Sequence, residues 1–331
     1  MTRCAVIGAG AWGTALADLL ARNGHEVSIW AYEWDVVESI NRSHLNRRFL
    51  AGHALCETLR AHNNVDDALK GAELVTFATP SHVLRAIAKS CRLLIPPNIP
   101  VVVASKGIEQ ETLCLMTDVI SQELPESVVV ALSGPSFAAE VVAQQPTAVV
   151  VASPDSSAAL FAQAAFSSKH FRAYTQADII GVEIGGSLKN VMAVATGIAD
   201  GLGLGFNARA ALITRGLAEM TRLGAKLGAD PATLSGLAGL GDLVLTCTGS
   251  LSRNRTVGVE VGRGVSLEEV LAGRETVAEG VVTTRSAHAL AAREEVEMPI
   301  VDAVYRVLFE NQPARDAIGS LMTRELRAEA D

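Results

Sequence analysis

The sequence has few aromatic residues and no excess of positive charge. Phe, Trp and Tyr make up 4% of its 331 residues, so hydrophobic cores must be packed mainly with Ala, Val, Leu and Ile. Asp and Glu number 36 against 28 Lys and Arg, a net charge of −8, and no long basic run is present. A general nucleic-acid binder usually carries a basic face or stripe, so nucleic acid is not an expected partner.

Metal-site, secretion and membrane signals are also missing. The five cysteines are widely spaced and form no CxxC or Cys/His pattern, so we expect reduced thiols and no metal site. Met1 leads almost directly into an apolar strand pattern, so no signal peptide is expected. The longest apolar stretches are short or interrupted by glycine, so no membrane span is expected. Together these features favour a cytoplasmic protein.

The length favours two domains, and the pattern of the chain changes near residues 175–185. Before this point, apolar runs alternate with helical spacing, which predicts a mostly parallel sheet. The strand candidates lie at residues 4–7, 26–30, 74–78, 100–104, 128–132 and 148–151. After it the pattern is helical, at 178–199, 208–227, 283–293 and 300–309. We predict an α/β domain over residues 1–178 and an all-helical domain over residues 179–331.

A glycine fingerprint, G-x-G-x-x-G, follows the first strand and opens the first helix. It comprises Gly8, Gly10 and Gly13, with Ala11 and Trp12 between them. The first glycine permits the tight turn, the second lets the backbone approach a pyrophosphate, and the third allows the helix to pack closely on the strand. The helix N-terminus then supplies amides for the anion. This context predicts a Rossmann-type domain that binds NAD or NADP; the alternative is a glycine-rich turn without a ligand.

An acidic residue about 20 positions after the fingerprint should bind the cofactor ribose. Glu33, just past the second strand, has this position. Its charge would oppose a phosphate on that ribose and so favours NAD. The alternative is a solvated carboxylate at the start of the next helix, where acids are also favoured.

Ligands of such a sheet bind beyond the carboxyl ends of the strands. Lys106 follows the strand that ends at residue 104, and Gly134 and Ser136 follow the one that ends at residue 132. We expect Lys106 to project toward the nicotinamide. The alternative is a surface lysine, the commonest fate of that residue.

Lys189 and Asn190 lie in a helix that is apolar on nearly every side. Such a helix is normally buried, and a buried lysine has a lowered pKa that suits proton exchange. A second cation nearby, such as Lys106, would lower this pKa further. The alternative is a lysine that extends to solvent at a domain edge.

Two further segments of the helical half carry polar groups. Asp242 follows a glycine-rich stretch, residues 236–241, which predicts a flexible loop leading into an apolar segment; the alternative for Asp242 is a helix cap. Beyond it, Ser252, Arg253 and Asn254 combine a guanidinium with hydroxyl and amide donors, which suits an anion. The alternative for this segment is an exposed turn with solvated charges.

Together these motifs closely resemble those of bacterial NAD(P)-dependent glycerol-3-phosphate dehydrogenases over nearly the whole chain. The resemblance rests on GAGAWGTALA at 8–17, ASKG at 104–107, SGPSFA at 133–138, GGSLKN at 185–190, NARAALITRGLAEM at 207–220, GLGDL at 239–243, Thr246-Cys247, SRNR at 252–255 and VAEG at 277–280. It implies a Rossmann-type domain followed by a helical domain like that of 6-phosphogluconate dehydrogenase.

The resemblance also implies roles for individual residues. Lys189 would exchange the proton, with Lys106 and Asp242 as the other catalytic groups. The cofactor would contact the glycine loop with Ala11 and Trp12, and also Lys106, Ala138, Arg253, Val277 and Glu279, with Glu33 at the ribose. The substrate would contact Lys106, Gly134, Ser136, Lys189, Asn190, Asp242, Thr246, Ser252, Arg253 and Asn254.

The implied activity is the reversible NAD(P)-dependent reduction of dihydroxyacetone phosphate to sn-glycerol 3-phosphate, for glycerophospholipid synthesis. The family suggests a homodimer. Members of the family often carry basic residues after the second strand, which suit NADP, so the resemblance allows either NAD or NADP as the cofactor. One rival interpretation is a 3-hydroxyacid dehydrogenase, which also places Lys and Asn on a long helix. Another is a dinucleotide sensor without turnover, which leaves a buried Lys189 without a purpose.

Overall fold

The computed structural model describes residues 1–272, 278–326 and 328–329. Its first half is built on an eight-stranded sheet with the order β10-β9-β8-β7-β6-β1-β2-β5. All pairs are parallel except β8 with β9. The strands are β1 (Arg3–Ile7), β2 (Glu26–Trp30), β5 (Arg60–His62), β6 (Leu74–Phe77), β7 (Pro100–Val103), β8 (Val128–Ser133), β9 (Thr147–Ala152) and β10 (Phe171–Gln176). A separate hairpin joins β3 (Leu45–Asn46) to β4 (Leu50–Ala54).

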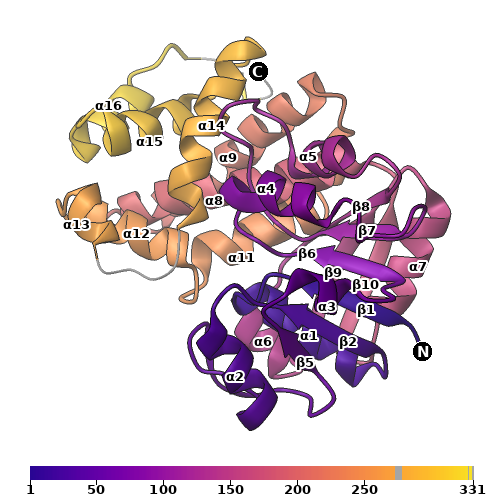
Figure 1. The fold of residues 1–331 in the computed structure, drawn as a ribbon. Coiled ribbons are helices and arrows are strands. Elements are labelled where there is room, and N and C mark those ends of the chain that lie inside the picture. Colours follow the sequence, from indigo (N-terminus) through magenta and orange to yellow (C-terminus); the bar gives the residue numbers. More distant parts are fainter. Residues whose placement is uncertain (273–277, 327, 330–331) are drawn as a thin grey trace.

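Helices cover both faces of this sheet (Figure 1). One face carries α1 (Ala11–Arg22), α2 (Trp34–Ser43), α6 (Ala138–Val142) and α7 (Ser156–Phe166), and the other carries α3 (Val65–Leu69), α4 (Ser81–Cys91) and α5 (Met116–Glu123). Successive residues of a strand point to opposite faces. In β1, Val6 therefore packs in one core cluster and Ile7 in the other, so the strand is apolar from Cys4 to Ile7.

The second half is helical and lies beside the carboxyl end of the sheet (Figure 1). Its central helix is α8 (Ile179–Gly201), and α9 (Phe206–Lys226) follows. The remaining elements are α10 (Pro231–Leu234), the π-helical turn η1 (Leu237–Gly241), α11 (Asp242–Thr248), α12 (Arg253–Gly262), α13 (Leu267–Leu271), α14 (Glu279–Arg293), α15 (Pro299–Phe309) and α16 (Ala314–Met322).

Helix α8 forms the core of this half. All its residues from Gly181 to Ala199 are buried. Two glycines allow α12 to lie against it: a Cβ at Gly197 would overlap the backbone of Arg255, and one at Gly258 would overlap that of Val194. By length and composition α8 could cross a membrane, as could the bent pair Pro231–Thr248 and Arg253–Gly262, but 89% of the apolar window of α8 is buried inside the protein. That is the environment of the core helix of a soluble protein.

The predicted fold class, a Rossmann-type α/β half followed by a helical half, is confirmed. The last strand ends at Gln176 and α8 begins at Ile179, although independent domains divided at residue 178 stay a prediction. Strand β10 was not predicted; it is an edge strand in which buried and exposed residues are mixed. The predicted loop at residues 236–241 is wrong, because η1 continues directly into α11.

A buried carboxylate joins two elements of the helical half. Glu219 of α9 is 1% exposed and accepts hydrogen bonds from the backbone N–H groups of Ile300 (2.7 Å) and Val301 (3.3 Å) at the start of α15. It thus caps a helix from another helix. Burial raises the pKa of Glu219 to about 7, and Asp302 adds to the rise, while these hydrogen bonds and Arg222 oppose it.

This pKa predicts a pH-dependent contribution to stability. The folded protein keeps a proton on Glu219 that the unfolded chain loses near pH 4.5, so its contribution to the free energy of unfolding falls as pH rises from about 4.5 to 7. Glu219→Gln keeps an acceptor for the two N–H groups but cannot ionise. Relative to wild type, we expect the variant to gain about 1–3 kcal/mol between pH 5 and 8, measured by urea unfolding. A difference that is constant with pH would contradict this prediction.

Candidate active site

The glycine loop lies at the point where the sheet reverses its order. Strand β1 pairs with β2 on one side and with β6 on the other, and ligands of such sheets bind in the crevice at this point. Gly8 has a φ of +113°, and a Cβ there would lie 2.9 Å from the carbonyl oxygen of Ala78. A Cβ at Gly13 would overlap the Gly8 carbonyl oxygen, so only glycine lets α1 start this close to β1.

Gly10 differs from these two glycines because a Cβ there would meet no atom within 4 Å. The second glycine of the fingerprint therefore faces open space at the N-terminus of α1, where a pyrophosphate can approach the backbone. Ala11 and Trp12 begin the helix and are partly buried. The Trp12 Nε1–H is buried and finds no acceptor within the described part of the chain, so it remains available to a ligand. These residues fit a dinucleotide.

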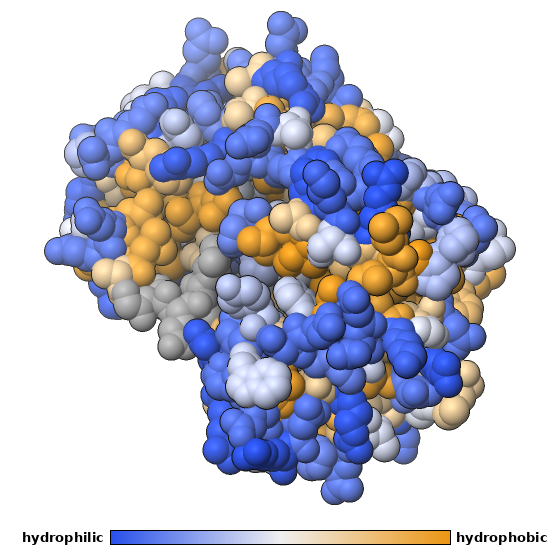
Figure 2. Space-filling model, viewed as in Figure 1, coloured by the Kyte–Doolittle hydropathy of each residue, from blue (hydrophilic) through white to orange (hydrophobic). Residues whose placement is uncertain are grey.

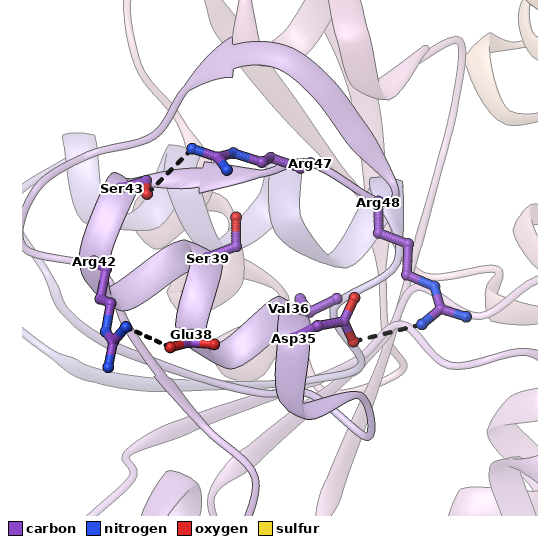
Figure 3. Close-up of a pocket in the computed structure, with 8 residues that line it drawn as sticks. All are labelled: Asp35, Val36, Glu38, Ser39, Arg42, Ser43, Arg47 and Arg48. Atoms are coloured by element: carbon purple, nitrogen blue, oxygen red, sulfur yellow. Dashed lines mark hydrogen bonds and ion pairs between the residues drawn. The ribbon is translucent and has the colours of Figure 1, made fainter.

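Glu33 stands at the predicted ribose position, as the residue before α2. A pocket of about 370 Å³ lies nearby on the outer side of α2 and the β3–β4 hairpin (Figure 3), lined by Asp35, Val36, Glu38, Ser39, Arg42, Ser43, Arg47 and Arg48. Its two acids are paired with arginines: Asp35 with Arg48 at 3.5 Å, and Glu38 with Arg42 at 2.5 Å. Because its charges are largely satisfied internally, we assign this pocket no ligand.

Three ionisable groups from separate parts of the chain meet beyond the sheet. Lys106 follows β7, Lys189 lies on α8, and Asp242 begins α11. The Lys106 Nζ lies 2.8 Å from Oδ2 of Asp242, and the Lys189 Nζ contacts Oδ1 of the same carboxylate. Asp242 is fully buried and Lys189 is 8% exposed. Lys189 therefore does not extend to solvent.

The surroundings of Lys189 set its proton affinity. Burial lowers the pKa of Lys189 to about 7; Lys106 lowers it further, and the Asp242 carboxylate opposes both effects. A buried lysine beside a second cation and a carboxylate is therefore poised between its two protonation states near neutral pH. Such a group can donate or accept a proton in a reaction.

Asp242 is not a helix cap, the alternative considered for it, because its carboxylate is bound by the two lysines. The glycines before it allow η1 to fit against its neighbours rather than form a flexible loop. A Cβ at Gly239 would overlap the backbone of Leu234, and one at Gly185 of α8 would overlap the carbonyl oxygen of Ala238. Thr246 lies one turn further on, and its hydroxyl donates to the Asp242 carbonyl oxygen at 2.6 Å.

The predicted anion segment begins α12. Ser252 caps this helix by accepting a hydrogen bond from the Arg255 N–H (3.3 Å), so the segment is a helix start and not an irregular turn. The Arg253 side chain is exposed, and its guanidinium makes no hydrogen bond to another described residue. Asn254 donates to the Asn190 side chain and accepts from the Gly280 N–H, both at 2.9 Å.

The segment after β8 lies along η1 and α11. Gly134 has a φ of +142°, and a Cβ there would lie 2.9 Å from Val149 Cα. Ser136 donates to the Gly134 carbonyl oxygen at 2.9 Å, and Ala138 begins α6. A Cβ at Gly241 would lie 3.6 Å from Pro135 Cγ, so this segment and Asp242 share one region.

Glu279 connects the two halves of the protein. The Ser81 hydroxyl at the start of α4 donates to its carboxylate at 2.9 Å. Burial raises the pKa of Glu279, while hydrogen bonds from Ser81 and nearby His82 and Arg253 oppose the rise. Val277, also predicted at the cofactor, lies outside the described residues. The sequence marks Ser81 as the start of a helix after a strand end, but no local pattern predicts its hydrogen bond to Glu279.

The chain is similar to glycerol-3-phosphate dehydrogenases along nearly all of its length. Residues 3–159 match the family described as NAD-dependent glycerol-3-phosphate dehydrogenase N-terminus, and residues 178–319 match the corresponding C-terminus. The chain is 54% identical over 330 residues to a glycerol-3-phosphate dehydrogenase [NAD(P)+] of Geobacter sulfurreducens, covering 99% of this chain and 98% of that protein. The Myxococcus xanthus protein of the same name is 51% identical, with the same coverage.

A crystal structure of glycerol-3-phosphate dehydrogenase from Coxiella burnetii superimposes with a TM-score of 0.94 at 41% identity, covering 98% of this chain and 99% of that one. Sequence and structure thus agree from end to end. The chain belongs to the NAD-dependent glycerol-3-phosphate dehydrogenase family.

Proposed function

We propose that this protein catalyses the reversible NAD(P)-dependent reduction of dihydroxyacetone phosphate to sn-glycerol 3-phosphate. The observation that carries the proposal is the buried Lys189–Asp242–Lys106 cluster, at the carboxyl end of a dinucleotide-binding sheet in a chain of this family. The relatives are named for this activity and for NAD(P)+. An oxidoreductase of this kind acts on a small-molecule substrate.

Lys189 is the proposed proton donor and acceptor. The cofactor, when bound, supplies or accepts the hydride. During reduction, negative charge builds on the substrate carbonyl oxygen, and the Lys189 ammonium donates a proton to it. During oxidation, the neutral Lys189 amine accepts the proton of the hydroxyl. A pKa of about 7 makes both forms accessible near neutral pH.

Lys106 and Asp242 adjust this step. The Lys106 ammonium adds positive potential where the oxyanion forms, and lowers the pKa of Lys189. Asp242 holds both ammonium groups through its two oxygens. It thereby keeps two like charges in one buried site, which neither burial nor their mutual repulsion favours.

The substrate phosphate is assigned to the start of α12. The Arg253 guanidinium is exposed and has a planar array of donors that matches a phosphate, and Ser252 and Asn254 flank it. Asn254 is also held by Asn190 of α8, the residue after Lys189. This link fixes the phosphate site relative to the proton donor, which limits unproductive substrate poses. Gly134, Ser136 and Thr246 are also assigned to the substrate.

The cofactor is assigned to the glycine loop with Ala11 and Trp12, and Glu33 to its ribose. Lys106, Ala138, Arg253, Val277 and Glu279 complete this site. Glu33 would accept hydrogen bonds from the ribose hydroxyls of NAD and would repel a 2′-phosphate. Among the residues directly after β2 no basic side chain offsets this charge, since Tyr32 and Trp34 flank Glu33.

We further propose that the enzyme acts in the cytoplasm and supplies glycerol 3-phosphate for glycerophospholipid synthesis. All five cysteines are free thiols, as expected of a reducing compartment.

A homodimer is the proposed assembly, formed through the helical half. Phe206, at the start of α9, is 81% exposed and lies next to the partly exposed Leu204. Figure 2 shows further apolar surface on this half, beside α12 and α13. Large apolar side chains left in water often mark an interface, and soluble oligomers are most often symmetric dimers.

Replacing Lys189 tests the proposed chemistry. Lys189→Met keeps an apolar stem but removes the ammonium, so we expect kcat to fall at least ~100-fold in both directions with little change in the Kd of NADH or NADPH. Turnover is followed at the nicotinamide absorbance. Lys226→Met, which changes an exposed lysine on α9, serves as the control. A Lys189→Met enzyme within a few-fold of wild type would refute the assignment.

Asp242→Asn tests the electrostatic balance. The Asp242 carboxylate raises the pKa of Lys189, so its loss should lower that pKa. The pH above which kcat/KM for reduction declines should therefore fall by about one unit or more. The measurement is kcat/KM for dihydroxyacetone phosphate against pH, and Asp230→Asn, at the cap of α10, is the control. A limb that stays in place contradicts this interpretation of Asp242.

The phosphate assignment predicts a specific defect in Arg253→Ala. Loss of a charge-assisted contact should raise the KM for dihydroxyacetone phosphate about 10–100-fold. Arg263→Ala, which removes an exposed arginine at the other end of α12, should leave this KM unchanged. An unchanged KM in Arg253→Ala would remove the residue from the phosphate site.

Sedimentation velocity tests the proposed dimer. Wild-type protein should sediment with about twice the mass of its 34.7 kDa chain, and Phe206→Glu should shift it toward the monomer because a charge in an apolar interface is unfavourable. Tyr32→Glu, which changes an exposed aromatic of the α/β half, is the control. A monomeric wild-type protein excludes the dimer, and a dimeric Phe206→Glu excludes this surface.

A further inference from the structure

A buried serine on α8 holds the backbone next to Lys106. The Ser187 hydroxyl is 3.1 Å from both the N–H and the carbonyl oxygen of Gly107, accepting from the first and donating to the second. Both partners are buried. The Ser187 hydroxyl of the helical half thus forms two hydrogen bonds, one as donor and one as acceptor, with the backbone of a single glycine in the α/β half.

The conformation of Gly107 makes this attachment specific. Its φ is +142°, and a Cβ at this position would lie 2.9 Å from both Cβ and Oγ of Ser81. Glycine is therefore required on both counts. On the other side of Lys106, the Ser105 hydroxyl donates to the Thr79 carbonyl oxygen at 2.7 Å. Lys106 is thus held from the sheet through Ser105 and from the helical half through Ser187.

This attachment opposes a local repulsion. The two ammonium groups share one buried carboxylate, and the Lys106 side chain, which is 17% exposed, has a path to solvent that would relieve their repulsion. The Lys106 stem also follows α8 closely, because a Cβ at Gly186 would lie 3.7 Å from Lys106 Cδ. Residues 186, 187 and 189 of α8 therefore all face the Lys106 segment.

We propose that Ser187 is a positioning residue that holds Lys106 against Asp242 and Lys189 by fixing the Gly107 backbone to α8. This inference rests on the proposed function of the two lysines and adds to it a residue that contacts neither substrate nor cofactor. Ser187 acts through Lys106, since its hydrogen bonds go only to the adjacent glycine among the described residues.

A mutant cycle tests whether Ser187 acts through Lys106. Ser187→Ala, Lys106→Ala and the double variant are compared with wild type for kcat of dihydroxyacetone phosphate reduction. Ser187→Ala alone should lower kcat about tenfold. In the Lys106→Ala background the same change should cost less than about twofold, because coupled residues are not additive. Ser286→Ala, which removes a buried hydroxyl without a partner in the described residues, is the control.

A pH profile supplies a second readout that loss of packing would not change. Lys189 is influenced by Asp242 of α11 and by Lys106, and it in turn acts on the buried Cys247 thiol of α11. If Lys106 withdraws in Ser187→Ala, its repulsion on Lys189 weakens. The pH below which oxidation of glycerol 3-phosphate declines should then rise. If the alanine variant unfolds below the assay temperature, Ser187→Cys provides the same comparison, because its thiol has a similar volume but forms only weak hydrogen bonds.

The outcomes separate the two proposals. The positioning role is supported if Ser187→Ala lowers kcat tenfold only in the enzyme that retains Lys106, and if the pH below which oxidation declines rises. An equal loss in both backgrounds, or an unshifted limb, overturns the role of Ser187 while leaving that of Lys106 intact. If Lys106→Ala itself retains wild-type kcat, the proposed role of Lys106 fails, and that of Ser187 fails with it.

Discussion

A single buried carboxylate, that of Asp242, holds two ammonium groups that would otherwise repel each other inside the protein. One of them, Lys106, comes from the end of a strand, and the other, Lys189, from the central helix of the helical half. The ion pair therefore links the two halves at the point where the chemistry is proposed. The same electrostatic balance keeps the pKa of Lys189 near neutrality, so structural linkage and proton transfer depend on one group.

Helix α8 makes this arrangement possible. It contributes Lys189 to the carboxylate, Ser187 to the Lys106 segment and Asn190 to Asn254. Its glycines permit the necessary close approaches: Gly185 to η1, Gly186 to Ser133, and Gly197 to α12. A helix that is apolar on nearly all sides can thus present a few polar groups inward, each with a partner already in place, which is how buried polar groups are tolerated.

Much of this could be predicted from the sequence, for identifiable physical reasons. Strand β2 was predicted with its observed bounds, residues 26–30. The continuous apolar runs of β7 and β8 predicted strands buried on both faces of the sheet. The burial of α8 followed from its apolar composition on all sides. The glycine fingerprint predicted a tight turn at Gly8 and an accessible backbone at Gly10. In the structure Gly8 has a φ of +113°, and a Cβ at Gly10 would meet no atom within 4 Å.

The remainder depends on contacts between distant residues. A helix cap remained an alternative for Asp242 because local pattern cannot show that Lys106 and Lys189 lie beside it. The stretch at residues 236–241 was expected to be a loop because glycine usually interrupts helices, whereas here the glycines fit η1 against Leu234 and α8. The pairing of Ser187 with Gly107, 80 residues apart, has no local signal.

The central claim is that Lys189 titrates near neutral pH, and ¹⁵N NMR of its side-chain Nζ against pH measures this directly. The account predicts a pKa of about 7; an ordinary lysine value of about 10.4 would contradict it.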